Sequence, residues 1–480
     1  MTAYRKKSIL LINPWIYDFA AYDLWIKPLG LLYMGGLFRE NGYHVYLIDC
    51  LNACHPQLKR FTGVKLPKRS VTGHGKLPQE RISKPQSLKG IKRNYNRYGI
   101  TPDILVSELK SSPRPDLILV TSMMTYWYPG VFEVIKITKH MLPGIPIVLG
   151  GIYATLCPEH AIKSGADIII TGAGEKQLSA LLHDFFGDDP LYAPDPDDLD
   201  SLPYPALDLL PFKDQFPILT SRGCPYNCTY CASRLLTDNF RQRTPARIVD
   251  EIHFWHKHFG VSQFSFYDDA LLMNPDEMAI PMLKEIIKRG LTCEFHCPNG
   301  LHISQIAPEL SKLMHMAGFA TIRFGFESFN PTTQLTTGGK VNNEQLQAAI
   351  RYLTEAGYKS EDIGIYLLCG LPGQEAAELR DSIRYVQLHG ARPIIAEYSP
   401  IPGTALWESA VRGSRFDLRG EPLFHNNSLL PCSSEKLTPE ISAVQYNLKW
   451  VLWPLWNQGF GRVFGFFENQ VASFFSSLHT

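Results

Sequence analysis

The stretch S-R-G-C-P-Y-N-C-T-Y-C-A-S-R, residues 221–234, holds three cysteines at C-x3-C-x2-C spacing: Cys224, Cys228 and Cys231. Thiolates favour soft metals and iron–sulfur clusters. A structural zinc site needs four ligands, usually in two separated pairs, and no fourth cysteine follows close by. The trio therefore favours a four-iron–four-sulfur (4Fe-4S) cluster with one iron left open, where a substrate or cofactor can bind directly.

This loop follows the first of six strand-like runs that helical stretches separate, for example 275–289 and 304–317. The runs are 217–221, 263–269, 293–300, 321–328, 362–370 and 393–400. Six βα units predict a partial (β/α)6 barrel of the TIM type. In such barrels the functional residues lie at the C-terminal ends of the strands, where the cysteines stand here.

The chain before residue 187 alternates strand and helix patterns in the same way. Near-continuous apolar runs lie at 8–13, 44–49, 116–122, 145–151 and 166–172. Such runs predict a Rossmann-like, doubly wound parallel sheet covered on both faces. Small or polar residues follow these strands, at the edge where open α/β sheets bind ligands: Asn13, Ser122, Gly150, Gly151 and Gly172.

Residues 52–100 interrupt this alternation with twelve Lys or Arg and one acid, Glu80. The segment carries +11 while the whole chain carries +1, so the remainder carries −10. We predict an insertion between the second and third strands. It is either a solvated surface excursion or a basic cap over an anionic ligand, an acidic substrate or RNA.

Composition and the remaining segments complete the domain prediction. With 45% hydrophobic and 19% charged residues, the 480-residue chain is typical of folded soluble proteins. No signal peptide or membrane span is recognisable, and the cysteine spacing favours a reducing cytoplasm. We expect domains at 1–186 and 217–405, a linker rich in Pro and Asp at 187–216, and a helical, aromatic-rich region at 406–480.

The motifs along the predicted barrel resemble the radical S-adenosylmethionine (SAM) superfamily. The resemblance rests on the cysteine trio with Tyr230 before its last member, on F-S-F-Y-D-D-A-L (264–271), I-R-F-G-F-E-S (322–328), Y-L-L-C-G-L-P-G-Q (366–374) and S-P-I-P-G-T-A-L-W-E (399–408). Upstream, residues 26–49 and 147–175 resemble the cobalamin-binding domain that precedes many such barrels. The chain is most similar to cobalamin-binding radical SAM enzymes, over roughly residues 1–405.

The resemblance implies a set of cofactors and contacts. The cysteine trio would hold the cluster, whose open iron chelates SAM and cleaves it to a 5′-deoxyadenosyl radical. Implied SAM contacts are Tyr230, Asp268, Asp269, Glu327, Ser328 and Gly370. Implied cobalamin contacts are Asn13, Ser122, Tyr126, Gly150, Gly151, Gly172 and Glu175.

One departure concerns the cobalt. Domains that ligate cobalt from below carry Asp-x-His-x-x-Gly, but here His55 comes six residues after Asp49 and no matching glycine follows. We therefore expect cobalamin without a lower-axial His, with loss of cobalamin as the alternative. The aromatic run Tyr126–Trp127–Tyr128 would either lie beneath the corrin or pack between domains.

Three residues are candidates for a catalytic role: Asp268, Cys297 and Cys369. Asp268 and Asp269 end a strand and must point to opposite faces, so one of them could contact SAM or act as a base. Cys297 and Cys369 are either small buried hydrophobes, as free cysteines usually are, or hydrogen-atom donors facing the radical.

The leading functional hypothesis is cobalamin-dependent methylation of an unactivated carbon in a small molecule, with a flavodoxin- or ferredoxin-type electron donor. The alternatives are radical cyclisation or oxidation without methyl transfer, RNA modification, and a non-catalytic corrin or SAM sensor. The basic segment motivates the RNA hypothesis, but no nucleic-acid-binding domain is recognisable.

Overall fold

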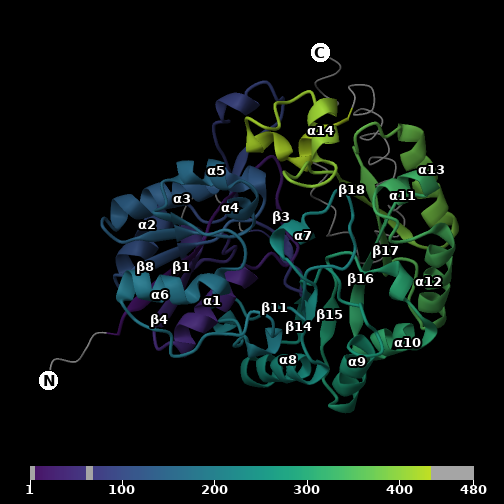
Figure 1. Cartoon of the computed structure of the whole chain (residues 1–480), viewed down its shortest axis with the longest axis horizontal. Helices are drawn as coiled ribbons and strands as arrows, with labels where there is room; N and C mark the ends of the chain where they lie inside the picture. The colour runs from purple at the N-terminus through teal and green to yellow at the C-terminus, as the bar shows by residue number, and fades with distance from the viewer. Residues whose placement is uncertain (1–5, 61–66, 68, 434–480) are drawn as a thin grey trace.

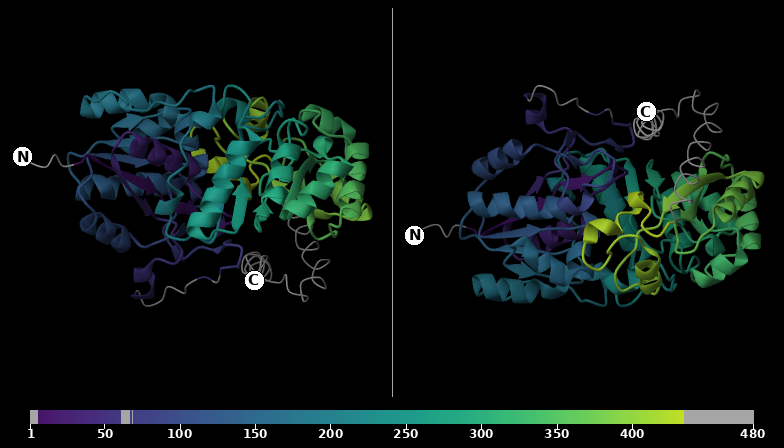
Figure 2. Two further views of the ribbon diagram at one scale, coloured as in Figure 1. Left: turned by 90° about the horizontal axis from the view of Figure 1, so that it is seen from below. Right: turned by 90° about the horizontal axis from the view of Figure 1, so that it is seen from above.

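The computed structural model describes residues 6–60, 67 and 69–433 of the chain (Figures 1 and 2). Two α/β units lie side by side, the first drawn in purple and blue and the second in teal and green. The aromatic series predicted near the C-terminus, from Trp450 to Phe467, lies outside the described residues.

The first unit is built on a five-stranded parallel sheet in the order β10-β9-β8-β1-β4. Its strands are β1 (Ser8–Asn13), β4 (His44–Asp49), β8 (Leu117–Val120), β9 (Ile147–Leu149) and β10 (Ile168–Ile169). All five predicted strands are confirmed. The chain runs from β1 to one edge and then crosses to β8 on the other side, so the order of strands reverses between β1 and β8. Such a switch point is where open α/β sheets bind ligands.

Helices cover both faces of this sheet, as the apolar runs predicted. Alternate residues of β1 enter different cores: Ile9 and Leu11 pack with α1 (Leu29–Glu40) and α6 (Leu178–Phe186). Leu10 and Ile12 enter a second core, to which α2 (Pro102–Ser111) and α3 (Tyr128–Met141) contribute.

The second unit is a six-stranded parallel sheet in sequential order, β11-β14-β15-β16-β17-β18. The strands are β11 (Phe216–Ile218), β14 (Gln263–Phe266), β15 (Glu294–His296), β16 (Phe319–Glu327), β17 (Ile363–Cys369) and β18 (Arg392–Glu397). Long helices follow most of these strands: α8 (Pro245–Phe259), α9 (Ala279–Lys288), α10 (Pro308–Ala317), α12 (Asn343–Glu355) and α13 (Ala376–Leu388). The predicted partial barrel is confirmed.

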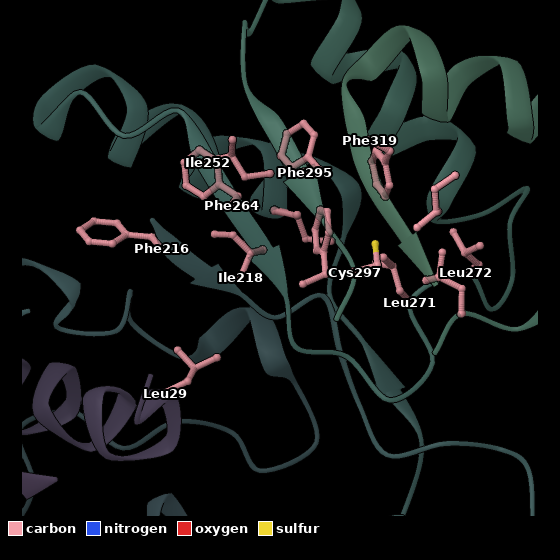
Figure 3. Close-up of a cluster of buried hydrophobic side chains, with 14 of the residues drawn as sticks. Leu29, Phe216, Ile218, Ile252, Phe264, Leu271, Leu272, Phe295, Cys297 and Phe319 are labelled. Carbon is pink, nitrogen blue, oxygen red and sulfur yellow. The ribbon is translucent and has the colours of Figure 1, made fainter. Parts of the chain in front are cut away.

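One face of the barrel sheet packs against these helices and forms the largest core. Phe266, Phe295 and Phe319 lie within 5.5 Å of one another by ring centroid. Figure 3 shows Cys297 in the same cluster, near the side chains of Leu271 and Leu272, with Phe295 and Phe319 also labelled. Residues of opposite parity along the same strands therefore face the barrel interior.

The basic segment forms part of the crossover from β4 to β8 and folds as short strands. These are β5 (Gly75–Lys76), β6 (Gln79–Arg81) and β7 (Asn96–Tyr98), which pair with β2 (Ile16–Asp18) and β3 (Tyr22–Asp23). Arg69 pairs with Asp23 at 2.8 Å and Arg97 with Glu80 at 2.5 Å. Part of the positive charge is thus neutralised within the fold.

The described chain ends with α14 (Trp407–Gly413) and two short 3-10 turns, Pro422–His425 and Asn427–Leu429. Within residues 6–60, 67 and 69–433, no helix has the length and apolar character needed to cross a membrane.

Candidate functional site

The three cysteines lie in the loop that follows β11 and the short strand β12 (Ser221–Arg222). Cys224 and Cys228 are half-buried and Cys231 is exposed. Gly223 turns the chain at φ +79°, and a Cβ there would stand 3.0 Å from the Asn239 carbonyl oxygen. In the described part of the chain, no three His, Cys, Asp or Glu side chains are placed to hold a single metal ion. Three cysteine thiols carried on one loop suit an iron–sulfur cluster held by thiolates.

Asp268 and Asp269 follow β14 and diverge, as adjacent residues of an extended chain must. The Asp268 carboxylate accepts hydrogen bonds from the Thr220 amide (3.0 Å), the Thr220 hydroxyl (2.6 Å) and the Ser221 hydroxyl (2.6 Å). Burial raises the pKa of Asp268 to about 6, although these donors oppose the shift. Asp268 therefore anchors the start of the cysteine loop.

Asp269 points the other way and belongs to the site itself. It accepts a hydrogen bond from Ser233 at 2.6 Å, two residues beyond the last cysteine. Burial raises the pKa of its carboxyl group. Of the two acids, Asp269 is the one that the structure places beside the cluster loop and at the edge of a cavity.

Glu327 ends β16 in an unusual backbone conformation. A register shift between Gly325 and Glu327 interrupts the pairing with β17, and Glu327 has φ +71°, which is rare for a residue other than glycine. This turn directs the carboxylate to the Tyr230 hydroxyl at 2.8 Å and to the Lys340 ammonium at 2.5 Å.

Lys340 is a buried cation beside the cysteines that the sequence did not single out. Burial opposes its charge, but Glu327 and then Cys228 raise the pKa of its ammonium group. The loop before it touches the cysteine loop, since the Thr229 amide donates to the Thr337 carbonyl at 3.1 Å. Burial raises the pKa of the Cys228 thiol, and the Lys340 charge opposes this shift. The cation thus favours a thiolate at Cys228.

A cavity of about 350 Å³ lies between the two units. Its walls come from the ends of β8, β9 and β10, from the start of α1, and from residues 221–223 and Asp269 of the second unit. One continuous cavity therefore joins the C-terminal edge of the first sheet to the start of the cysteine loop.

The residues expected to contact cobalamin divide into two groups. Gly150, Gly151, Gly172 and Glu175 line the cavity. Asn13 and Ser122 do not line it. Asn13 donates to Asp49 at 2.8 Å, and Ser122 donates to the carbonyl of Gly150, a lining residue, at 2.6 Å.

The aromatic run at 126–128 packs between segments and does not line this cavity. The Tyr126 hydroxyl donates to Asn427 at 3.3 Å, Trp127 donates to Asp18 at 2.7 Å, and the Tyr128 hydroxyl donates to Glu421 at 3.0 Å. The run was expected either beneath the corrin or packed between domains, and its position fits packing.

The remaining predicted residues lie away from the cavity. The Ser328 hydroxyl donates to Glu378 on α13 at 2.6 Å, and the Gly370 amide donates to Gln374 at 2.8 Å. Cys297 and Cys369 are 1% and 0% exposed within the hydrophobic core, and burial raises the pKa of both thiols. Their position fits small buried hydrophobes.

Arg222 is a second residue that sequence reasoning missed. Its guanidinium forms an ion pair with Glu175 across the two units and lies over the Tyr33 ring, 5.5 Å from the centroid. The sequence offered one signal, because Arg222 directly precedes the cysteine loop. Lys340 offered none, since its T-T-G-G-K setting resembles any polar turn.

Comparison with known proteins finds two family models along the chain. Residues 218–386 match the radical SAM superfamily and residues 90–182 match the B12 binding domain. An uncharacterised methyltransferase of Pyrococcus horikoshii is 25% identical over 347 residues, which cover 65% of this chain and 74% of the relative. Cytidylyl-2-hydroxyethylphosphonate methyltransferase of Streptomyces wedmorensis is 22% identical over 472 residues, and the match covers 85% of this chain and 82% of that protein.

The fold is also similar to a solved structure. The radical S-adenosylmethionine methyltransferase TsrM from Kitasatospora setae matches with a TM-score of 0.62 at 15% identity, over 88% of this chain and 83% of that chain. At this identity the likeness concerns the arrangement of the two α/β units.

Proposed function

The chain belongs to the radical SAM superfamily and carries a B12-binding domain, and on that premise we propose that it methylates an unactivated carbon of a small molecule. When bound, the cluster and SAM supply a carbon-centred radical, and cobalamin supplies a methyl carrier. The residues of this chain bind and orient these groups.

The cavity is the observation that carries the proposal. Gly150, Gly151 and Gly172 present backbone at the ligand-binding edge of the first sheet, and residues 221–223 complete the same space. A corrin held there would adjoin the cluster loop. Glycine suits this edge because a bulky planar ligand needs close approach to the main chain.

The cysteine loop fits an anionic iron–sulfur cluster. Cys224, Cys228 and Cys231 would ligate it, and buried Lys340 would complement its negative charge. Glu327 and Tyr230 hold the Lys340 ammonium in place. Asp269, beside the last cysteine, is the acid we assign to SAM contact.

The remaining assignments follow from the same chemistry. We assign a flavodoxin- or ferredoxin-type protein as electron donor, because the cluster must receive a low-potential electron. We place the protein in the cytoplasm, where thiolates stay reduced. The domain boundaries at 186, 217 and 405 stay predictions.

The test is to incubate the anaerobic, reduced protein with SAM and hydroxocobalamin and to analyse both SAM-derived products. Methyl donation leaves S-adenosylhomocysteine, whereas reductive cleavage leaves methionine and 5′-deoxyadenosine. The proposal predicts both products. Formation of 5′-deoxyadenosine alone would move the assignment to radical cyclisation or oxidation. If neither product forms, the proposal is overturned.

A cavity-filling variant tests the location. Ala173 lines the cavity with an ordinary backbone conformation, φ −73°, so Ala173→Trp fills the space without strain in the main chain. We expect loss of cobalamin binding with iron content unchanged. Retention of cobalamin would place the corrin elsewhere.

A further inference from the structure

Two arginines face the barrel interior in one row of the sheet. Arg323 of β16 and Arg392 of β18 both pair in register with Gly364 of β17, which lies between them. Ile322 and Phe324 on β16 enter the core under the helices, so Arg323 points to the opposite, interior face. Adjacent strands lie about 4.8 Å apart, so the Cα atoms of the two arginines lie roughly 10 Å apart, on either side of a residue without a side chain.

Among the described residues, no carboxylate forms a direct ion pair with Arg323 or Arg392. Arg323 donates from Nη1 to the Tyr366 hydroxyl at 3.0 Å, and the Nε atoms of both arginines are buried without a partner. Asp362 and Glu361 act on Arg392 only at a distance, and burial followed by the Arg323 charge lowers the pKa of Arg392.

An aromatic pair adjoins this row on the interior face. Trp25 stacks on His296 with ring centroids 4.4 Å apart and planes 16° apart, and its indole N–H donates to the Thr72 carbonyl at 2.6 Å. His296 is also fixed by Thr321, at 3.0 Å, two residues before Arg323 on the same face.

Two further polar groups of the described interior carry no charge at pH 7. Burial lowers the pKa of His296 to about 4, so its ring is neutral at pH 7. Ser265, in the same row as His296, is 0% exposed and its hydroxyl is unpartnered.

Two like charges without a counterion are unfavourable in a partly buried site, and such arrangements concentrate where a ligand supplies the missing charge. Guanidinium groups match the two acceptor oxygens of carboxylate and phosphoryl groups.

We propose that Arg323 and Arg392 bind an oxyanion of the substrate inside the barrel, a carboxylate or a phosphoryl group, beside the Trp25–His296 pair. This inference rests on the proposed function and names the substrate class. Glu327 lies four residues beyond Arg323 on β16, so the anion would bind roughly 13 Å from the end of the strand that carries Glu327. The substrate is therefore an extended anion whose far end reaches the reactive centre.

The test measures binding of two small anions, methylphosphonate and propionate, to the intact protein by titration calorimetry. The variants are Arg323→Gln and Arg392→Gln, with Arg384→Gln as the matched control on the exposed face of α13. We expect one anion to bind wild type and the control, and to bind each interior variant about tenfold more weakly, the effect of losing a charge-assisted hydrogen bond. The anion that binds shows whether the site takes a carboxylate or a phosphoryl group.

A second readout separates binding from structure. Removal of an unpaired charge should leave the anion-free variants at least as resistant to urea as wild type, whereas arginines with a structural role would destabilise on removal. Equal binding by wild type and both interior variants, or no binding of either anion, would overturn the inference.

The two proposals fail in distinguishable ways. If iron and 5′-deoxyadenosine formation are normal while the anion result is negative, only the interior site is wrong. If iron is absent, the proposed function fails first.

Discussion

At the scale of single residues, the site depends on charges that are buried and satisfied locally. Asp268 receives donors from Thr220 and Ser221, and Lys340 is held by Glu327 and Tyr230. Each of these side chains fixes a loop that carries or touches a cysteine. Substitutions here should therefore alter stability and cluster binding together.

Asp268 predicts a pH dependence of unfolding. The folded protein holds its proton up to a pKa of about 6, against 3.8 for the free side chain, so the contribution of Asp268 is fully present below pH 3.8 and is lost as the pH rises through 6. A shift of two pH units corresponds to about 3 kcal/mol of unfolding free energy. Urea unfolding of the metal-free protein should show this decline, and Asp268→Asn should lack it. The same decline in the variant would contradict the assignment.

The Lys340–Glu327 pair predicts non-additive stability. The side chains are 14% and 7% exposed, so Lys340→Met leaves a buried, unpaired carboxylate and should cost about 3 kcal/mol. Lys340→Met combined with Glu327→Gln should cost less than either single change, because neither charge is then left alone. Chemical denaturation of the four proteins gives the coupling energy. Additive costs would mean that the pair is not coupled.

Residue patterns predicted part of this arrangement. The cysteine spacing singled out the cysteine loop. Because adjacent residues of a strand point to opposite faces, the sequence also predicted that Asp268 and Asp269 lie on different sides. Lys340 could not be predicted, because it reaches the cysteines only through a bulge at Glu327 and a loop more than a hundred residues further along the chain. The unpaired state of Arg323 and Arg392 likewise depends on register between strands.

At the scale of elements, two loops support each other around the cluster position. The cysteine loop and residues 335–340 touch through Thr229 and through Gly338, whose missing side chain leaves room for Cys228. A Cβ at Gly338 would stand 2.9 Å from the Cys228 Cα atom, and the backbone there has φ +132°. The approach of the two loops therefore requires glycine at this position.

Gly338→Ala should displace the cysteine loop and reduce the iron content of the reconstituted protein. Gly339→Ala is the matched control, because Gly339 also has positive φ, +63°, but its nearest neighbour is a Leu335 methyl group at 4.0 Å. The control should lose roughly 1 kcal/mol through backbone strain and keep its iron. Iron assay and denaturation distinguish the two. Equal iron in both variants would contradict the role of the contact.

The strands and the barrel were predictable because their patterns are local. Strand-like runs of five to nine residues signalled every strand of both main sheets. The short strands β2, β3, β5, β6 and β7 could not be predicted in this way. Segments of two or three residues carry no periodicity and form strands only by pairing with distant segments.

At the scale of the whole molecule, the two units meet at one cavity. The cavity joins the ends of β8, β9 and β10 to residues 221–223, and the Arg222–Glu175 ion pair bridges the same boundary. Its position follows from two general rules, since each unit presents the C-terminal ends of its strands. The sequence could not predict that these two ends face each other, because that depends on packing between residues far apart in the chain.

The central claim is that cluster and corrin bind side by side in this chain. The most direct measurement is iron content and the absorption spectrum of protein purified without oxygen, with and without hydroxocobalamin. Wild-type protein should hold about four irons per chain and a bound corrin, and Cys228→Ala should lose the iron. Wild-type protein without iron or without bound corrin, or a Cys228→Ala variant that keeps its iron, would contradict this proposal.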